Sequence, residues 1–290
     1  MFVFAMVNGN TYFYPHQIMK MKRKNAFLFC LFVGIAGFCR AAIETVDTYS
    51  ASMKKTIKAT VVTPTKTDVT VAMPVVYLLH GYGGNYASWT KEMGADLQAY
   101  VDQYNMMIVC PDGLGSWYWD SPSDSTYKYE TYVATELVQW VDKQYNTIKT
   151  PKGRGITGLS MGGHGALYLA LKHQDVFGTA GSMSGGVDIR PFPNNWEMSR
   201  RLGKQSDEPE RWEKFTVINM LHLLTANSLA LIIDCGTEDF FYQVNEKLHQ
   251  ELLYRNIPHD YITRPGAHNW PYWRNAIPYQ LLFMNKFFRS

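Results

Sequence analysis

The sequence is poor in charge and in cysteine. Charged residues make up 18% of its 290 positions, the net charge is +3, and no basic stripe runs along the chain. Because a nucleic-acid-binding surface needs clustered lysine and arginine, we expect no nucleic-acid partner. The four cysteines and eight histidines show no spacing typical of a metal site. We therefore expect neither a metal nor another cofactor.

The sequence also lacks a hydrophobic run long enough to span a membrane comfortably. The apolar run near the N-terminus, Ala26 to Phe38, is shorter than the ~20 residues that a transmembrane helix needs. A basic cluster at residues 20–24 precedes this run, and the small residues Ala41 and Ala42 follow it. Basic, apolar and small zones in this order are typical of a secretory signal peptide.

We accordingly interpret residues 1–41 as a leader, with its true start at Met19 or Met21, and we expect a secreted or periplasmic protein without a stable membrane anchor. Two of the four cysteines lie within this leader. The other two, Cys110 and Cys235, end apolar runs, which favours buried free thiols. A disulfide between them is the alternative in an oxidising compartment.

Strand and helix patterns alternate along residues 42–290. From Thr45 to Val62 polar and apolar residues alternate, as in an antiparallel pair of strands. Short apolar runs then follow, separated by amphipathic helical segments, as expected where helices cover both faces of a sheet. The predicted strands are Val75–Leu79, Met106–Cys110, Arg154–Gly158, Thr179–Met183, Leu229–Asp234 and His259–Thr263, and the predicted helices are Ala87–Tyr104, Tyr129–Tyr145, Met161–His173 and Phe241–Arg255. This rhythm predicts an α/β protein with a mostly parallel sheet between two layers of helices.

The alternation breaks between Gly186 and Ser228. This stretch contains three prolines and a charged run, and its clearest helical pattern covers Trp212 to Leu224. We interpret residues 186–228 as an insertion over one end of the sheet rather than as a separate domain. Residues 42–290 are thus expected to form a single domain.

The strongest local motif is Gly158-Leu159-Ser160-Met161-Gly162, which lies between a predicted strand and a predicted helix. A serine raised clear of a sheet on a sharp turn needs small residues two positions to either side, where larger side chains would collide. The N–H groups at the start of the following helix also favour a developing negative charge. We therefore predict that Ser160 is a nucleophile, although the motif alone can arise by chance.

A serine hydroxyl becomes a good nucleophile only when a base takes its proton and a third group orients that base. On this type of sheet the partners follow in the order Ser, acid, His, each after a later strand. Asp239 follows the predicted strand that ends at Asp234, and His268 follows the last predicted strand. We predict these two as the acid and the base. Glu238 is the alternative acid, and Asp234 is expected to be structural.

Acyl transfer also needs backbone N–H donors that face the oxygen of the tetrahedral intermediate. One donor is expected from the residue after the nucleophile, Met161. The other is expected from the glycine-rich loop at residues 80–84, where Tyr82 is our choice and Gly81 is the second. His80 and His164 lie inside the two glycine-rich motifs and are expected to pack or to form hydrogen bonds.

Together these motifs resemble the esterase D / antigen 85 family of α/β-hydrolases. The resemblance is carried by LLHGYGG, IVCPDGLGSWYWDSP, YETYVATEL, GLSMGGHGAL, SMSGG, DCGTEDFF and PGAHNWPYWRNAIP, which span nearly all of the mature chain. This family includes S-formylglutathione hydrolases, mycolyltransferases and the feruloyl esterases of carbohydrate esterase family 1. The resemblance implies the α/β-hydrolase fold, with an eight-stranded sheet in the order 1-2-4-3-5-6-7-8. It also implies Ser160, Asp239 and His268 as a catalytic triad, with Tyr82 and Met161 as oxyanion donors.

Four aromatic residues near these motifs are candidate substrate-binding residues, namely Trp117, Tyr118, Trp119 and Trp270. They could form an apolar wall for an acyl group or stack on sugar rings. Ordinary packing is the alternative for each of them.

The resemblance and the leader together predict an exported serine carboxylesterase that works through an acyl-enzyme. Its expected substrate is a small-molecule or carbohydrate-linked acyl ester, such as a feruloyl or acetyl ester of xylan. The alternatives are an S-formylglutathione hydrolase, a general short-chain esterase, an acyltransferase, and a non-catalytic binding module that keeps the fold. The sequence leaves the acyl group, the alcohol and the oligomeric state open.

Overall fold

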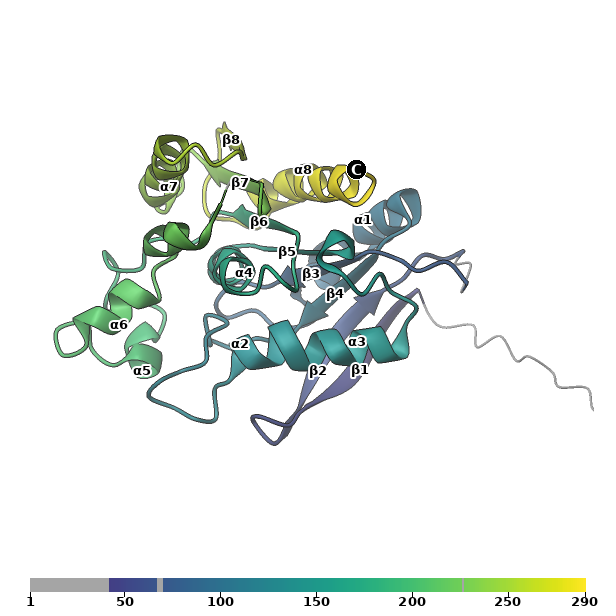
Figure 1. The fold of residues 1–290 in the computed structure, drawn as a ribbon, viewed down its shortest axis with the longest axis horizontal. Helices are drawn as coiled ribbons and strands as arrows, with labels where there is room; N and C mark the ends of the chain where they lie inside the picture. Colours follow the sequence, from purple (N-terminus) through teal and green to yellow (C-terminus); the bar gives the residue numbers. More distant parts are fainter. Residues whose placement is uncertain (1–41, 67–69, 226) are drawn as a thin grey trace, which may run out of the picture. The chain divides into compact units, whose positions relative to one another are not determined.

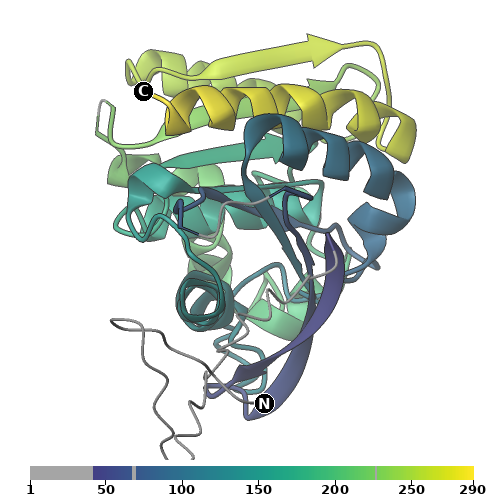
Figure 2. The ribbon, with the colours of Figure 1, turned by 90° about the vertical axis from the view of Figure 1, so that its right-hand side faces the viewer.

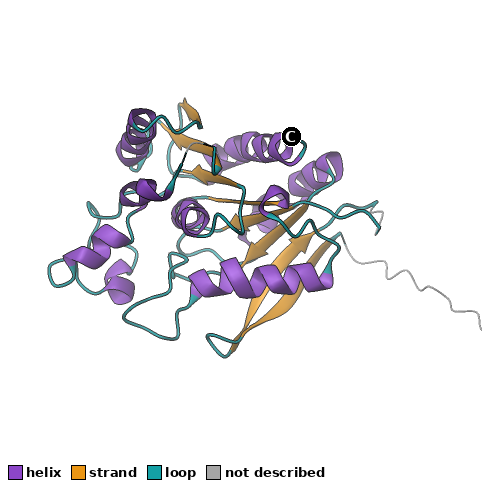
Figure 3. Ribbon diagram, in the orientation of Figure 1, coloured by secondary structure: helices purple, strands orange, loops and turns teal. Residues whose placement is uncertain are grey.

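The computed structural model describes residues 42–66, 70–225 and 227–290, which form one eight-stranded sheet with helices on both sides (Figures 1 and 3). The expected leader, with its two candidate starts, lies outside the described residues. The strand order is β1-β2-β4-β3-β5-β6-β7-β8, which is the order implied by the family resemblance. The prediction of an α/β-hydrolase fold is confirmed.

The sheet begins with an antiparallel pair, as the alternating pattern predicted. Strand β1 (Ile43–Ser50) pairs with β2 (Lys55–Val62), and Ile43 lies opposite Val62. β1 is one of the two edge strands, and its side chains alternate in burial along most of its length. This edge therefore keeps the two-residue period of a strand with one covered face.

The other six strands run parallel to one another. They are β3 (Val75–Leu79), β4 (Met107–Pro111), β5 (Arg154–Gly158), β6 (Thr179–Met183), β7 (Ala230–Gly236) and β8 (Asp260–Arg264). Every residue of β3 to β6 is buried, and most of them are apolar or small, as expected where helices cover both faces of a sheet. The exception is Arg154 on β5, whose guanidinium pairs with Asp142. Cys110 on β4 and Cys235 on β7 are free and buried, with three strands between them, so the free thiols are confirmed.

Two layers of helices cover the sheet. Helices α1 (Ser88–Tyr104) and α8 (Trp270–Phe288) lie side by side on one face and share one apolar core (Figure 2). The other face carries α4 (Met161–Lys172), α7 (Tyr242–Tyr254) and the segment from residue 129 to 144. That segment consists of α2 (Tyr129–Thr131), the π-helical η1 (Tyr132–Leu137) and α3 (Val138–Gln144). The short 3₁₀ turn η2 (Pro151–Gly153) leads into β5. Sequence reasoning did not predict α8.

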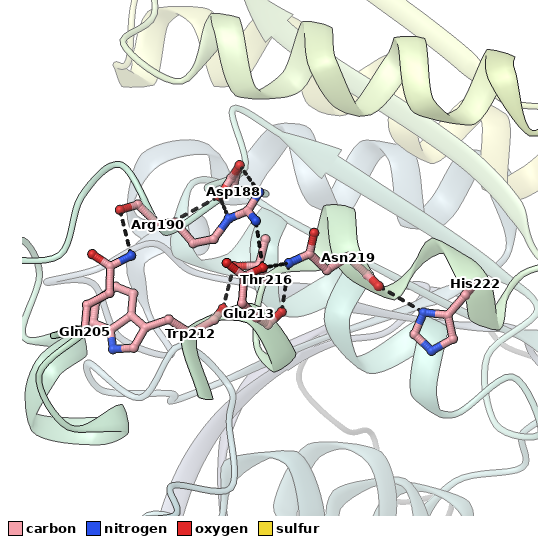
Figure 4. Close-up of polar contacts among 8 residues, drawn as sticks. All are labelled: Asp188, Arg190, Gln205, Trp212, Glu213, Thr216, Asn219 and His222. Carbon is pink, nitrogen blue, oxygen red and sulfur yellow. Dashed lines mark hydrogen bonds and ion pairs between the residues drawn. The ribbon is translucent and has the colours of Figure 1, made fainter. Parts of the chain in front are cut away.

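The segment expected as an insertion is built from short helices. They are α5 (Met198–Leu202), α6 (Pro209–Lys214) and the 3₁₀ segment η3 (Val217–Leu223). The helix predicted over residues 212–224 is thus divided between α6 and η3. Arg190 connects the segment internally (Figure 4), because its guanidinium lies 2.7 Å from Asp188 Oδ2 and 2.7 Å from Glu213 Oε2. Such a network gives a defined shape to a stretch that has little regular structure.

Candidate active site

Ser160 occupies a sharp turn between the end of β5 and the start of α4. Its φ of 57° and ψ of −118° are unusual for a residue with a side chain. The turn brings the two flanking glycines against backbone. A Cβ at Gly158 would lie 2.7 Å from the carbonyl of Gly162, and one at Gly162 would lie 2.5 Å from the oxygen of Leu79. This close packing is the physical reason for glycine at both positions.

Three side chains from distant parts of the chain meet at this turn. His268 Nε2 lies 2.9 Å from Ser160 Oγ, and His268 Nδ1 lies 2.8 Å from Asp239 Oδ2. Asp239 is buried and its Oδ1 also accepts a hydrogen bond of 2.8 Å from the backbone N–H of Phe241. A carboxylate that accepts a hydrogen bond from Nδ1–H keeps the proton of the neutral ring on Nδ1, so the Nε2 lone pair faces the serine hydroxyl. The arrangement can therefore remove the serine proton.

The two other carboxylates considered from the sequence lie elsewhere. Asp234 is fully buried on β7, where the Tyr272 hydroxyl donates to it and Arg264 pairs with it. Burial raises the pKa of Asp234 to about 6, against the effects of Tyr272 and Arg264. Glu238 is exposed, and its backbone N–H donates to the carbonyl of Gly266. Of the candidate acids, the structure places only Asp239 against His268.

The two expected oxyanion donors flank the nucleophile. Met161 is the first residue of α4, and Tyr82 lies on the loop between β3 and α1. A Cβ at Gly81 in that loop would lie 3.2 Å from Ser160 Cβ, so the loop passes directly beside the nucleophile. Within the described part of the chain, neither the Met161 nor the Tyr82 N–H donates a hydrogen bond to the protein. Their role as oxyanion donors stays a prediction.

A cavity of about 450 Å³ opens over Ser160 and His268. Four aromatic side chains and the glycine-rich loop form most of its wall. Its lining consists of Gly81, Tyr82, Gly83, Gly84, Ser88, Leu159, Ser160, Trp196, Phe240, His268, Trp270 and Trp273. The ring of Phe240 lies 4.3 Å from the ring of His268, and Trp196 stacks on Phe240 at 5.8 Å between centroids. An apolar group of a bound ester would contact these rings.

The comparisons with known proteins agree with this geometry. A family model described as "Putative esterase" matches residues 50–284. The chain belongs to this esterase family. An acetyl esterase of Caldicellulosiruptor saccharolyticus is 26% identical over 265 residues, which cover 84% of this chain and 98% of the relative. The diacylglycerol acyltransferase/mycolyltransferase Ag85B of Mycolicibacterium smegmatis is 27% identical over 241 residues, which cover 70% of this chain and 73% of the relative.

Solved structures give the same result. A ferulic acid esterase superposes on this esterase with a TM-score of 0.73 at 26% identity, covering 85% of this chain and 98% of the other. The S-formylglutathione hydrolase of Staphylococcus aureus superposes with a TM-score of 0.73 at 21% identity, covering 84% and 98%, and it shares the fold. The family resemblance stated from the motifs is confirmed. The esterase is an enzyme that hydrolyses carboxylic esters.

Of the four aromatic residues predicted to bind substrate, only Trp270 lines the cavity of this esterase. Trp117, Tyr118 and Trp119 are at most 1% exposed, and their prediction as cavity walls is wrong. Their polar atoms are satisfied inside the protein, because Tyr118 Oη donates to the carbonyl of His80 and Trp117 Nε1 donates to the carbonyl of Trp196. These rings support the floor of the site from within the core.

Sequence reasoning missed three of the aromatic residues that line the cavity, Trp196, Phe240 and Trp273. Phe240 follows Asp239 directly, and Trp273 lies in the same motif as His268, so their nearness to the predicted triad was a usable signal. Trp196 gave no such signal, since it belongs to the insertion. In the part of the chain that the structure describes, there is no helix that could cross a membrane and no cluster of ligands for a metal.

His164 connects the helix of the nucleophile to the loops behind it. Trp119 Nε1 donates to His164 Nε2 at 2.8 Å, and His164 Nδ1 lies 2.8 Å from the carbonyl of Gly186. Trp Nε1 can only donate and a carbonyl can only accept, so this ring is neutral with its proton on Nδ1. Burial lowers the pKa of His164 from its ordinary value of 6.5 to about 4.

We expect His164 to make the folded state sensitive to acid. The pKa of His164 is lower in the folded protein than in the unfolded chain, so the neutral ring contributes to the free energy of unfolding. This contribution is fully present above pH 6.5 and is lost as the pH falls through about 4. The shift corresponds to roughly 3 kcal/mol in the free energy of unfolding. The free energy of unfolding in urea, measured at several pH values between 7 and 4 for the wild type and for His164→Gln, tests this prediction. If both proteins lose stability in parallel, the prediction is wrong.

Proposed function

We propose that this protein is an exported serine carboxylesterase that hydrolyses acyl esters through a covalent acyl-enzyme. The observation that carries this proposal is the hydrogen-bonded chain from Ser160 through His268 to Asp239. It joins a nucleophile, a base and an orienting carboxylate at the floor of an open cavity. Met161 and Tyr82 supply the two N–H donors that stabilise the oxyanion.

The reaction proceeds in two halves. In the first, His268 takes the proton of Ser160 as its oxygen attacks the ester carbonyl, and the tetrahedral intermediate carries its negative charge beside the two N–H donors. The intermediate then expels the alcohol, which receives the proton from His268, and leaves an ester on Ser160. In the second half, His268 activates a water molecule, which releases the carboxylic acid and restores the serine.

The proposed substrate is a carbohydrate-linked acyl ester, such as a feruloyl or acetyl ester of xylan. The acetyl esterase and ferulic acid esterase relatives support this class, each at 26% identity. The aromatic walls contributed by Trp196, Phe240 and Trp270 suit an aromatic acyl group or a sugar ring. The proposal of export rests on the sequence pattern of the leader. It also fits the proposed substrate, because an enzyme that acts on polysaccharide works outside the cell.

The test is labelling with a fluorophosphonate, followed by a panel of esters. We expect one adduct per chain, located on the peptide that contains Ser160, and turnover of methyl ferulate or acetylated xylan. The panel also includes p-nitrophenyl acetate and S-formylglutathione, and assays with added alcohols detect acyl transfer. If only nitrophenyl esters are hydrolysed, the polysaccharide substrate is wrong and a general esterase remains. An unlabelled, inactive protein would contradict the serine mechanism itself.

A further inference from the structure

The ring of His80 connects two loops at the catalytic end of the sheet. His80 directly follows β3, opens the glycine-rich loop of residues 80–84, and is 1% exposed. The backbone N–H of Gly113, in the loop after β4, donates a hydrogen bond of 2.8 Å to His80 Nε2. On the other side of the ring, His80 Nδ1 lies 2.8 Å from the carbonyl oxygen of Gly81. Both nitrogens of this buried ring, which is not part of the triad, thus contact backbone.

These two partners fix the protonation of the ring. A backbone N–H can only donate, so His80 Nε2 accepts from Gly113 and carries no proton. The proton of the neutral imidazole is therefore on Nδ1, which donates it in a hydrogen bond to the Gly81 carbonyl. Asp112 Oδ1 lies 3.7 Å from Nε2, which is too far for a hydrogen bond. The ring consequently has one donor and one acceptor in fixed directions.

The carbonyl that His80 holds belongs to the peptide of the expected oxyanion donor. The Gly81 C=O and the Tyr82 N–H are parts of one planar trans peptide unit, so they point in opposite directions. The N–H of Gly84 donates to the same Gly81 oxygen at 3.0 Å. Because the two hydrogen bonds hold the oxygen, they also set the direction of the Tyr82 N–H.

The glycines of this loop make such a restraint necessary. Gly81 has no side chain to limit its backbone rotation. A larger residue cannot take its place, because a Cβ there would lie 3.2 Å from Ser160 Cβ. Tyr118 Oη donates to the carbonyl of His80 at 3.0 Å and so holds the preceding peptide. Hydrogen bonds to buried side chains, rather than steric limits, therefore maintain the conformation of the loop beside the nucleophile.

We propose that His80 is a positioning residue, which directs the Tyr82 N–H at the oxyanion through the Gly81 carbonyl. The inference rests on the proposed function, in which that N–H is an oxyanion donor. A donor is most effective when its direction is set before the charge develops, because the reaction then includes no reorganisation of the loop. His80 provides this preorganisation from behind the loop, since it does not line the cavity.

Two amide variants separate the roles of the two ring nitrogens. In His80→Asn, the amide nitrogen takes the place of Nδ1 and can still donate to the Gly81 carbonyl, while the acceptor for Gly113 is lost. In His80→Gln, the amide oxygen can reach the place of Nε2 and accept from Gly113, while the donor to Gly81 is lost.

We expect the two variants to differ in rate on p-nitrophenyl acetate. In His80→Gln, kcat and kcat/KM should fall equally, by about tenfold, because the lost interaction acts in the transition states of both halves of the reaction. This loss is smaller than the ~10²–10³ that follows removal of a donor, since the Tyr82 N–H is misdirected and not deleted. His80→Asn should stay within about threefold of the wild type.

Two further measurements separate positioning from general damage. Rates are expressed per folded chain, from circular dichroism, because each substitution breaks a buried hydrogen bond and lowers stability. A trifluoromethyl ketone forms a tetrahedral oxyanion on the serine, so its inhibition constant should rise in His80→Gln by the factor by which kcat/KM falls. His222→Gln makes the same chemical change at an exposed histidine of η3 and should keep the wild-type rate.

The inference is overturned if His80→Gln keeps the kcat and the inhibition constant of an active wild type, or if His80→Asn is the slower variant. If neither variant folds, NMR spectra of the imidazole nitrogens of the wild type distinguish a proton on Nδ1 from one on Nε2. A His80 ring protonated on Nδ1 supports the inference, and one protonated on Nε2 overturns it. An inactive wild type would instead overturn the proposed function.

Discussion

Ser160→Ala loses ester hydrolysis almost completely, and we expect kcat/KM to fall by roughly 10⁴–10⁶-fold. The substitution removes the oxygen that His268 Nε2 contacts at 2.9 Å, so no acyl-enzyme can form. What remains is the attack of water assisted by the oxyanion donors and by binding alone. The measurement is the initial rate on the best substrate of the panel, with fluorophosphonate labelling of the same preparations.

The fold should survive this change, because alanine removes only one oxygen from the turn. Ser206→Ala, at an exposed serine of the insertion, is the matched control and should keep the full rate. The contradicting result is a Ser160→Ala protein, purified free of other esterases, that keeps more than about one per cent of the wild-type rate. In that case another residue is the nucleophile.

Asp239→Asn should lower kcat by roughly 10³–10⁴-fold while leaving the protein folded. The carboxylate accepts a hydrogen bond from His268 Nδ1–H and so keeps the Nε2 lone pair directed at Ser160. An amide can present its NH₂ group instead, which stabilises the other tautomer, in which Nε2 carries the hydrogen and cannot act as a base. The carboxylate also stabilises the imidazolium formed during attack, and a neutral amide does not.

Glu238→Gln is the matched control, because it makes the same chemical change at the adjacent, exposed position. We expect it to keep the wild-type rate within a factor of about two. Steady-state kinetics of both variants over pH 5–9 provide the measurement. If Asp239→Asn stays within tenfold of the wild type, or if Glu238→Gln is the slower enzyme, then Asp239 is not the orienting acid.

The comparison of sequence and structure shows where local patterns suffice. The six predicted parallel strands all exist, and five of them agree with the structure to within one residue at each end. Short apolar or small runs mark most of them, because a strand covered on both faces buries nearly every side chain. The β7 strand extends two residues beyond the predicted Asp234, since Cys235 and Gly236 still pair with β8. Helix α8 was missed although its sequence is largely apolar, because the motif around His268 was interpreted only as a loop.

The aromatic residues show where local patterns fail. Trp117, Tyr118 and Trp119 follow a strand at the catalytic end of the sheet, which made them plausible cavity walls. Whether a ring at such a place points out or in depends on loop conformation, and both Trp117 and Tyr118 adopt left-handed φ values of 58° and 61°. Their rings turn into the core. No local pattern in the sequence encodes that choice.

The sequence by itself determined the class of sheet, the sharp turn at Ser160 and the chain order of the three residues that meet there. These features follow from short-range requirements: apolar strands, glycines beside the turn, and side chains at the ends of successive parallel strands. Only the tertiary structure decided which aromatic rings line the cavity, and that Trp196 of the insertion stacks on Phe240 beside His268. Those contacts join loops far apart in the chain, so their geometry depends on how every element between them packs.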